Sequence, residues 1–402
     1  MIIGIDASRA NTRYKSGTEL VAFHLIQEIK KIADPQDQFI LYSKEPLLTP
    51  LTDLPVNFTS RVLSWPPKYL WTQIRLAWEM LVRPPDVLFI PAHTIPIFHP
   101  KKTYTILHDI GFEYFSELYS KTTIGHSLPL IRKIINILIR IATFGSYGAT
   151  EIDYHRWSAR FALRHASKII TVSEFSRQEI MRFYGAHPDK IVMLHNAFDP
   201  SYHRLHDQQF IDKALGTYAI GKPFLLYIGR LEAKKNTPRL IEAFSLLKIK
   251  YHYPGKLVLV GKPGFGFNEV ESQITKCNVR DFVIRPGWIS ADELPAIMNA
   301  ADAFVFPSVY EGFGMPILEA MNCGTPVITS NRGATAEVSG GAAQLVNPDN
   351  TLDIAEGIQK VLNDPTTKNR LVESGYKRAA EFSWPRAARE YLSLLKTGKV
   401  RT

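Results

Sequence analysis

Short apolar runs alternate with amphipathic stretches along almost the whole chain. Apolar runs of strand length, each followed by a stretch of helical periodicity, predict parallel strands joined by helices, which is an α/β fold. In the first half we expect strands at 1–6, 38–43, 57–63, 86–91, 103–108, 168–173 and 190–196. In the second half we expect them at 223–229, 256–261, 282–287, 303–307, 326–330 and 343–347.

Apolar periodicity is lost over 200–221, which divides the pattern into two sets of strands. We therefore expect a first domain at 1–200, a linker at 201–222 and a second domain at 223–380. With 402 residues, of which 45% are hydrophobic, the chain is long enough for two cores. The expected fold is two doubly wound, Rossmann-like domains that face each other across a ligand-binding cleft.

The segment Pro307–Ala320 has the sequence PSVYEGFGMPILEA and leads from a predicted strand into a predicted helix. Two glycines keep its loop slim, and Pro316 suits the first turn of a helix. Glu311 then lies on the loop and Glu319 in the first helical turns, near the carboxyl end of a strand, where open α/β sheets bind ligands. Their carboxylates could accept hydrogen bonds from sugar hydroxyls. Alternatively, Glu319 only complements the helix dipole and Glu311 is a solvated loop residue.

A second predicted strand end carries two basic residues. The strand stops at Gly229, Arg230 extends from its carboxyl end, and Lys235 follows just before a helix. The two-pronged arginine side chain and the mobile lysine charge together suit a diphosphate. A solvated basic loop is the alternative interpretation of this pair.

Both motifs resemble those of retaining glycosyltransferases of family 4, which have the GT-B fold. Glu311 and Glu319 match the Glu-x7-Glu signature, and Arg230 and Lys235 match the Gly-Arg-x4-Lys motif that begins at Gly229. The resemblance implies transfer of a hexose from a nucleotide diphosphate sugar, with retention of configuration and without a metal. It implies that Arg230 and Lys235 bind the diphosphate and stabilise it during catalysis. Glu319 would bind the ribose, and Glu311 would position the donor sugar.

The resemblance also assigns donor-binding roles outside the charged residues. The loop residues that it places around the donor are Gly229, Gly312, Phe313 and Gly314. It implies that the backbone of Ile289 contacts the nucleobase. Core packing of the neighbouring Trp288 would explain that segment equally well.

Three residues of the first domain are further candidates. Gly17 precedes the amphipathic run 20–32, and the resemblance implies that it lets the backbone approach a phosphate. An N-cap at Ser16 or Thr18, with an incidental glycine between them, would explain the same residues. His108 and Asp109 end a predicted strand and resemble the family's His-Asp pair, in which the histidine lies close to the donor sugar. His93 ends the preceding strand and is a weaker candidate on the acceptor side.

The net charge of +10 favours an acidic partner, and since no nucleic-acid motif is recognised we expect none of that kind. Eight Lys or Arg and only two acidic residues lie within 121–168. A helix at 128–144 would carry a narrow polar strip on an otherwise apolar surface, too interrupted by charge to span a membrane. Either it buries its apolar face in the first domain, or it lies peripherally on an anionic membrane.

Cys277 and Cys323 are the only cysteines, which excludes a disulfide framework and a Cys-rich metal site. The chain starts with a strand pattern instead of a signal peptide, so we expect a cytoplasmic protein. It would act at the inner face of the membrane if the basic segment binds lipid. We expect no metal and no other cofactor. The resemblance further implies that a final helix within 381–402 crosses back to the first domain.

The form of the motifs is most similar to bacterial mannosyltransferases of surface-glycan synthesis, such as that of lipopolysaccharide. The resemblance therefore implies GDP-mannose as the first candidate donor, a UDP-hexose as the second, and a glycan or lipid-linked acceptor. Two further alternatives are a nucleotide-sugar epimerase of similar architecture and a nucleotide-sugar-binding protein without catalysis.

Overall fold

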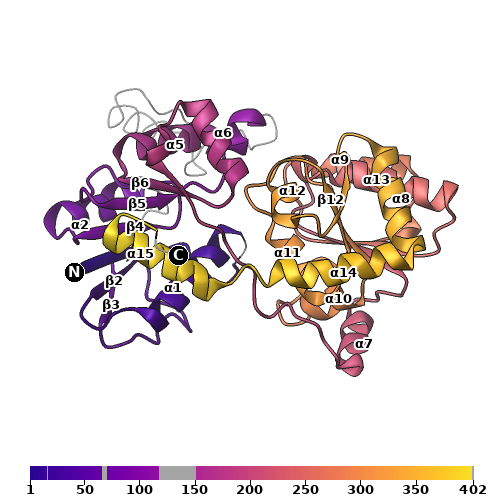
Figure 1. The fold of residues 1–402 in the computed structure, drawn as a ribbon, viewed down its shortest axis with the longest axis horizontal. Helices are drawn as coiled ribbons and strands as arrows, with labels where there is room; N and C mark the ends of the chain where they lie inside the picture. Colours follow the sequence, from indigo (N-terminus) through magenta and orange to yellow (C-terminus); the bar gives the residue numbers. More distant parts are fainter. Residues whose placement is uncertain (16, 66–69, 117–150, 401–402) are drawn as a thin grey trace. The chain divides into compact units, whose positions relative to one another are not determined.

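The computed structural model describes residues 1–15, 17–65, 70–116 and 151–400 (Figure 1). The chain forms two units, one of 1–196 with 383–402 and the other of 197–382, and the structure defines each unit by itself. Both units are parallel sheets flanked by helices, which confirms the expected fold class. The helix expected at 128–144, and with it the choice between core packing and membrane contact, lies outside the described residues.

The first unit is built on a seven-stranded parallel sheet with the order β3-β2-β1-β4-β5-β6-β7. The order reverses direction between β1 and β4, so Ile3 of β1 pairs with Phe39 on one side and Val87 on the other. Central strands buried on both faces explain the continuous apolar runs in the sequence. The strands are β1 (Ile2–Asp6), β2 (Gln38–Ser43), β3 (Phe58–Val62), β4 (Val87–Ile90), β5 (Thr103–Ile106), β6 (Lys168–Thr171) and β7 (Ile191–Met193).

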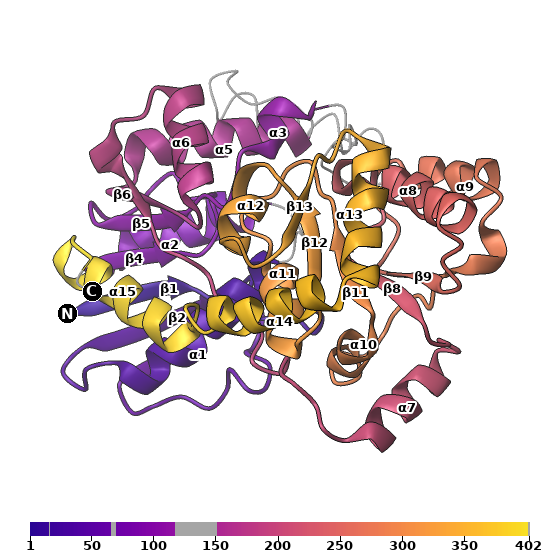
Figure 2. The same ribbon diagram turned by 45° about the vertical axis from the view of Figure 1, so that its right-hand side comes forward.

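The last helix of the chain completes the first unit. Helix α15 (Trp384–Thr397) lies beside α1 (Thr18–Ile32) in both views (Figure 1 and Figure 2). The ring of Trp384 stacks on His24 with the ring centroids 5.2 Å apart, and Lys396 Nζ lies 2.6 Å from Asp37 Oδ2. The other helical elements are η1 (Trp71–Leu76, a π-helical turn), α2 (Ala77–Val82), α3 (Gly111–Tyr114), α5 (Glu151–His165), α6 (Glu174–Tyr184) and η3 (Pro188–Lys190).

The second unit repeats this design with a six-stranded parallel sheet in the order β10-β9-β8-β11-β12-β13. Here the strand order reverses between β8 and β11, and crossover helices connect the parallel strands. The strands are β8 (Phe224–Ile228), β9 (Lys256–Val260), β10 (Val283–Ile284), β11 (Ala303–Phe306), β12 (Val327–Ser330) and β13 (Gln344–Val346).

Helices surround the second sheet, and α14 lies alongside α11 (Figure 2). The α-helices are α7 (Gln208–Thr217), α8 (Thr237–Lys250), α9 (Phe267–Lys276), α10 (Leu294–Ala300), α11 (Met315–Cys323), α12 (Gly333–Ser339), α13 (Thr351–Asn363) and α14 (Pro365–Ala379). Two short 3-10 turns, η4 (Ala233–Lys235) and η5 (Arg280–Phe282), complete the unit. Among the described helices, none is both long and apolar enough to cross a bilayer.

Every expected strand range contains a strand, but the segment expected as a linker at 201–222 contains helix α7. Asp207 caps this helix by accepting a hydrogen bond from the backbone N–H of Phe210 at 3.0 Å. Ile211, Ala214 and Leu215 are its buried residues. Three buried positions give too little helical periodicity in the sequence to predict a helix there.

Candidate active site

The loops that carry the predicted charged residues follow two neighbouring strands at the centre of the second sheet. Phe304 of β11 pairs with Leu226 of β8, so the carboxyl ends of these strands lie side by side. They flank the point at which the strand order reverses, and open α/β sheets bind ligands outside such a point. Arg230 and Lys235 follow β8, and Glu311 follows β11.

Glycine is required where β8 and β9 end. A Cβ atom on Gly261 would lie 1.8 Å from the carbonyl oxygen of Gly229, closer than any side chain can approach. Gly229 itself has a φ of 156°, and a Cβ there would lie 2.9 Å from the hydroxyl oxygen of Tyr227. The backbones at the ends of β8 and β9 therefore pass too close together for a side chain at Gly261. Arg230, the next residue after Gly229, is exposed to solvent.

The structure brings Lys235 and Glu311 into direct contact. Lys235 Nζ lies 2.5 Å from Glu311 Oε1, with side-chain exposures of 19% and 12%. The ammonium also lies 5.8 Å from the centre of the Phe306 ring at the end of β11. Partial burial strengthens such a pair relative to one in open water. The pair thus places an ammonium suited to a phosphate and a carboxylate suited to sugar hydroxyls at the same strand ends.

Asn236 fixes this arrangement and was missed by the sequence analysis. Its side-chain amide donates hydrogen bonds to the carbonyl oxygens of Pro307, at 3.0 Å, and Pro348, at 2.7 Å. It therefore connects the loop of Lys235 to the start of the loop of Glu311. Asn236 has a φ of 62°, and asparagine tolerates this conformation better than most residues do. An asparagine immediately before a predicted helix was the available signal.

Glu319 lies in a different environment from Glu311. It sits on α11 with only 6% of its surface exposed, near Asp199 and Tyr202. Burial raises the pKa of Glu319 to about 8, the nearby Asp199 carboxylate adds to this, and a backbone hydrogen bond from Asp199 opposes it. The carboxyl group is therefore mostly protonated at neutral pH and can donate a hydrogen bond as well as accept one. Among the described residues, it forms no salt bridge with Arg230 or Lys235.

The other predicted donor residues of the second unit are mostly buried. Phe313 packs its ring 5.8 Å from that of Phe382, and Gly312 and Gly314 are buried in the same loop. Ile289 is 3% exposed, and its backbone contact with the nucleobase stays a prediction. The interpretation that Trp288 packs in the core is wrong, because 54% of this residue is exposed. Lys262 Nζ lies 5.1 Å from the centre of its ring.

Gly17 occupies the N-cap position of α1, with a φ of 47°. The Thr18 N-cap alternative is wrong because α1 begins at Thr18, and no side chain of the described residues caps the helix. The Ser16 alternative lies outside the described residues. Chain neighbours aside, a Cβ atom on Gly17 would meet no atom of the described residues within 4 Å. The space beside this glycine is therefore open to an approaching group, as the phosphate role requires, while the role itself stays a prediction.

His108 and Asp109 follow β5 but have separate local partners. His108 Nε2 lies 3.4 Å from the carbonyl oxygen of Pro91, and Asp109 Oδ1 accepts a hydrogen bond from the backbone N–H of Gly111 at 2.8 Å. Burial lowers the pKa of His108 and the Arg9 charge lowers it further, while the Pro91 carbonyl and Asp109 oppose the shift. His108 is therefore a neutral imidazole at neutral pH. Asp109 stabilises the start of α3.

His93 is paired with a residue that the sequence analysis did not single out. His93 Nε2 lies 2.8 Å from Nδ1 of His155 on α5, and Phe112 stacks against both rings. Burial, followed by the charge of His155, holds the pKa of His93 well below its usual range. The two imidazoles thus form a hydrogen-bonded pair at the carboxyl edge of the first sheet. Within the described residues, no group of three or more His, Cys, Asp or Glu side chains is placed to hold a metal ion.

Two protein-family models match consecutive parts of the chain. Residues 210–378 match the model described as glycosyl transferases group 1, and residues 54–202 match glycosyltransferase family 4. The first match contains Arg230, Lys235, Glu311 and Glu319, and the second contains His108 and Asp109.

The chain is also similar to individual glycosyltransferases. It is 32% identical over 247 residues to O-antigen chain mannosyltransferase B of Escherichia coli, covering 61% of this chain and 65% of that one. It is 29% identical over 230 residues to the serotype-specific mannosyltransferase WbdA of Escherichia coli, covering 56% of this chain and 28% of the relative. The matches thus span less than two thirds of the length of these relatives.

Solved structures show the same fold over nearly the full length. A structure of HepE from Anabaena with UDP and glucose has a TM-score of 0.68 at 18% identity, covering 98% of this chain and 99% of that one. WaaG, a glycosyltransferase involved in lipopolysaccharide biosynthesis, has a TM-score of 0.70 at 14% identity, covering 99% and 100%. Two consecutive segments of the chain thus match glycosyltransferase family models, and the whole chain shares the fold of these glycosyltransferase structures.

Proposed function

We propose that the chain transfers a hexose from a nucleotide diphosphate sugar to a glycan or lipid-linked acceptor, with retention of configuration. One observation carries the proposal: Lys235 and Glu311 meet at 2.5 Å where β8 and β11 end at the switch point of the second sheet. Arg230 is exposed at the end of β8. Two cationic groups and a carboxylate at this edge suit a diphosphate joined to a sugar.

The proposed reaction breaks the bond between the sugar C1 and an oxygen of the diphosphate. Negative charge develops on that oxygen, and Arg230 and Lys235 stabilise it in place of a metal. The acceptor hydroxyl oxygen forms its bond to C1 on the same face, and its proton passes to the departing phosphate. Glu311 accepts a hydrogen bond from a donor hydroxyl, and the protonated Glu319 contacts the ribose.

The ion pair between Lys235 and Glu311 holds both side chains near their working positions before the donor arrives. Groups that are already in place reorganise little when charge develops, which is the main source of electrostatic catalysis. Asn236 contributes by connecting the two loops. The roles of Gly17, His108 and Asp109 in the first unit stay predictions, as does a cleft between the domains.

GDP-mannose is the proposed donor because the Escherichia coli relatives are mannosyltransferases. A UDP-hexose is the second candidate, supported by the UDP bound in the HepE structure. The proposed acceptor is a growing surface glycan, and the proposed site of action is the cytoplasmic face of the membrane. The net charge of +10 supports contact with an anionic surface.

A panel of nucleotide sugars, each incubated with and without lipid extract and with a chelator, tests the proposal. Nucleotide release that depends on acceptor, is greatest with GDP-mannose and survives chelation is the expected result. Conversion of the donor sugar without acceptor would identify an epimerase. Tight donor binding without turnover would identify a binding protein.

Replacement of one lysine tests the site itself. Lys235→Met removes the charge but keeps most of the side-chain length, and we expect turnover to fall by roughly a hundredfold to a thousandfold. Lys250→Met is the matched control, because Lys250 is a half-exposed lysine of the same unit that pairs with Glu356 at 3.6 Å. Both variants should keep the wild-type circular dichroism spectrum. Full activity of Lys235→Met would refute the role assigned to Lys235.

A further inference from the structure

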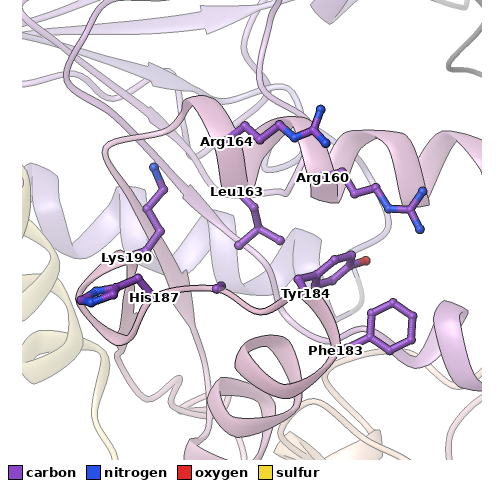
Figure 3. Close-up of a pocket in the computed structure, with 8 residues that line it drawn as sticks. Arg160, Leu163, Arg164, Phe183, Tyr184, His187 and Lys190 are labelled. Atoms are coloured by element: carbon purple, nitrogen blue, oxygen red, sulfur yellow. The ribbon is translucent and has the colours of Figure 1, made fainter.

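A pocket of about 510 Å³ lies in the first unit, between α5 and the connection from α6 to β7 (Figure 3). We call it the basic pocket because Arg160, Arg164, His187 and Lys190 line it. The two arginines come from α5, and the other two residues come from the connection that leads into β7. No predicted site residue lies among its lining.

Among the residues that the structure describes, no carboxylate forms a salt bridge with the arginines or the lysine of the basic pocket. Within the described residues, Arg160 and Arg164 form no salt bridge, and both are exposed. Within the same part of the chain, Lys190 Nζ donates one hydrogen bond, to the carbonyl oxygen of Ala166, and an ammonium has two further protons to donate. The positive field also acts on His165, whose pKa is lowered first by burial and then by neighbouring positive groups that include Arg164 and Lys190.

The carboxylates near the basic pocket do not cancel its charge. Glu113 accepts hydrogen bonds from Arg156 Nε at 2.7 Å and from the Tyr184 hydroxyl at 2.8 Å, so it is already compensated. Asp189 lies 3.6 Å from His187, but its side chain is 86% exposed and therefore well screened by solvent. Three full positive charges remain along the lining.

Part of the lining is apolar. In Figure 3 the Leu163 side chain projects from α5 between Lys190 and Tyr184, and Phe183 lies beyond Tyr184. Phe183 is 40% exposed, and the hydrogen bond to Glu113 fixes the Tyr184 ring. Arginine and lysine next to aromatic and aliphatic surface suit a ligand that has both an anionic and an apolar part.

The basic pocket lies at the opposite edge of the first sheet from His108. Arg164 is in the last turn of α5, just before β6 begins, and Lys190 directly precedes β7. The pocket therefore adjoins the amino ends of parallel strands, whereas His108 follows the carboxyl end of β5. A strand of four residues is roughly 13 Å long. One small ligand cannot occupy both places.

We propose that the basic pocket is a second binding site, for a phosphate ester that carries an adjoining apolar group, separate from the site of sugar transfer. Arg160, Arg164 and Lys190 bind the phosphate oxygens, and Leu163 with the two aromatic rings contacts the apolar part. An anionic phospholipid and a soluble organic phosphate share this chemistry. The site does not depend on the proposed transfer reaction.

Two probes distinguish the sources of the ligand. Phenyl phosphate is titrated into the full chain by calorimetry, and vesicles of phosphatidylglycerol mixed with phosphatidylcholine are tested by co-sedimentation against pure phosphatidylcholine. Arg160→Ala/Arg164→Ala should weaken binding of the responding probe at least about tenfold, the loss expected for two charge-assisted contacts. Binding of phenyl phosphate identifies a soluble ester, and binding of the anionic vesicles alone identifies a lipid.

A matched control separates the pocket from general charge. Arg370→Ala/Arg389→Ala removes two exposed arginines from α14 and α15 and should leave binding unchanged. Leu163→Trp keeps the charge but fills the pocket, and it should abolish the binding. Equal losses in both arginine pairs, full binding by Leu163→Trp, or no binding of either probe by the wild-type chain would overturn the proposal.

Discussion

Glu319→Gln tests the unusual state of the buried carboxyl group on α11. Burial raises the pKa of Glu319 from 4.5 to about 8, so the folded and unfolded chains release this proton at different pH. Below pH 4.5 the group is protonated in both states and has no effect on stability. Between these values the folded chain holds the extra proton, and the free energy of unfolding therefore falls as the pH rises. Above about pH 8 the loss is complete and stays constant.

The size of the effect follows from the two pKa values. The difference between 4.5 and about 8 corresponds to a loss of up to about 5 kcal/mol in the free energy of unfolding. Glutamine has no proton to release and a similar shape. The stability of Glu319→Gln relative to wild type should therefore rise with pH, by up to about 1.4 kcal/mol per pH unit between roughly pH 5 and pH 8.

Urea unfolding followed by circular dichroism at several pH values measures this difference. Glu373→Gln is the control, since Glu373 is an exposed glutamate on the neighbouring α14. The free energy of unfolding of this variant should change with pH in the same way as that of wild type. Titration of the labelled Glu319 carboxyl carbon by NMR gives the pKa directly. A midpoint near 4.5, or parallel stability curves for Glu319→Gln and wild type, would refute the reasoning.

Two further substitutions test the packing and the loop connection. Trp384→Ala should lower the stability of the first unit by about 3–5 kcal/mol in thermal or urea unfolding, because the buried indole stacks on His24. Trp78→Ala is the control and should have little effect, because Trp78 is exposed. Asn236→Ala leaves the buried carbonyl oxygen of Pro307 without this donor, while that of Pro348 keeps a hydrogen bond from Arg239 at 2.8 Å. The substitution should cost about 1–3 kcal/mol in unfolding of the second unit and weaken donor binding in calorimetry. Unchanged stability in either buried variant would contradict these contacts.

The strands were predictable because parallel strands in a doubly wound sheet are buried on both faces. β4 and β11 are buried at every position and appear in the sequence as short apolar runs between helical patterns. β10, which has two partly buried residues, is much shorter than its expected range. Helix α7 was not recognised because its buried stripe is short. The presence of a strand could thus be predicted from an apolar run in the sequence. The length of a strand and the presence of a short helix depend on tertiary contacts and could not.

The candidate site was predictable only in part. The contact between Lys235 and Glu311 follows from strand order, because both residues come just after adjacent central strands. The raised pKa of Glu319 depends on burial and on Asp199, a residue far away in the sequence. The pairing of His93 with His155 likewise joins residues from distant elements. Such long-range environments leave no local pattern from which they could be predicted.

The central claim is that the strand ends of β8 and β11 bind the diphosphate of a sugar nucleotide. Calorimetric titration of GDP into wild type, Arg230→Ala and Lys250→Met measures this binding directly. The account predicts that wild type and Lys250→Met bind GDP equally, and that Arg230→Ala binds it at least about tenfold more weakly because a charge-assisted contact is lost. Equal affinity for GDP in Arg230→Ala and wild type would contradict the claim.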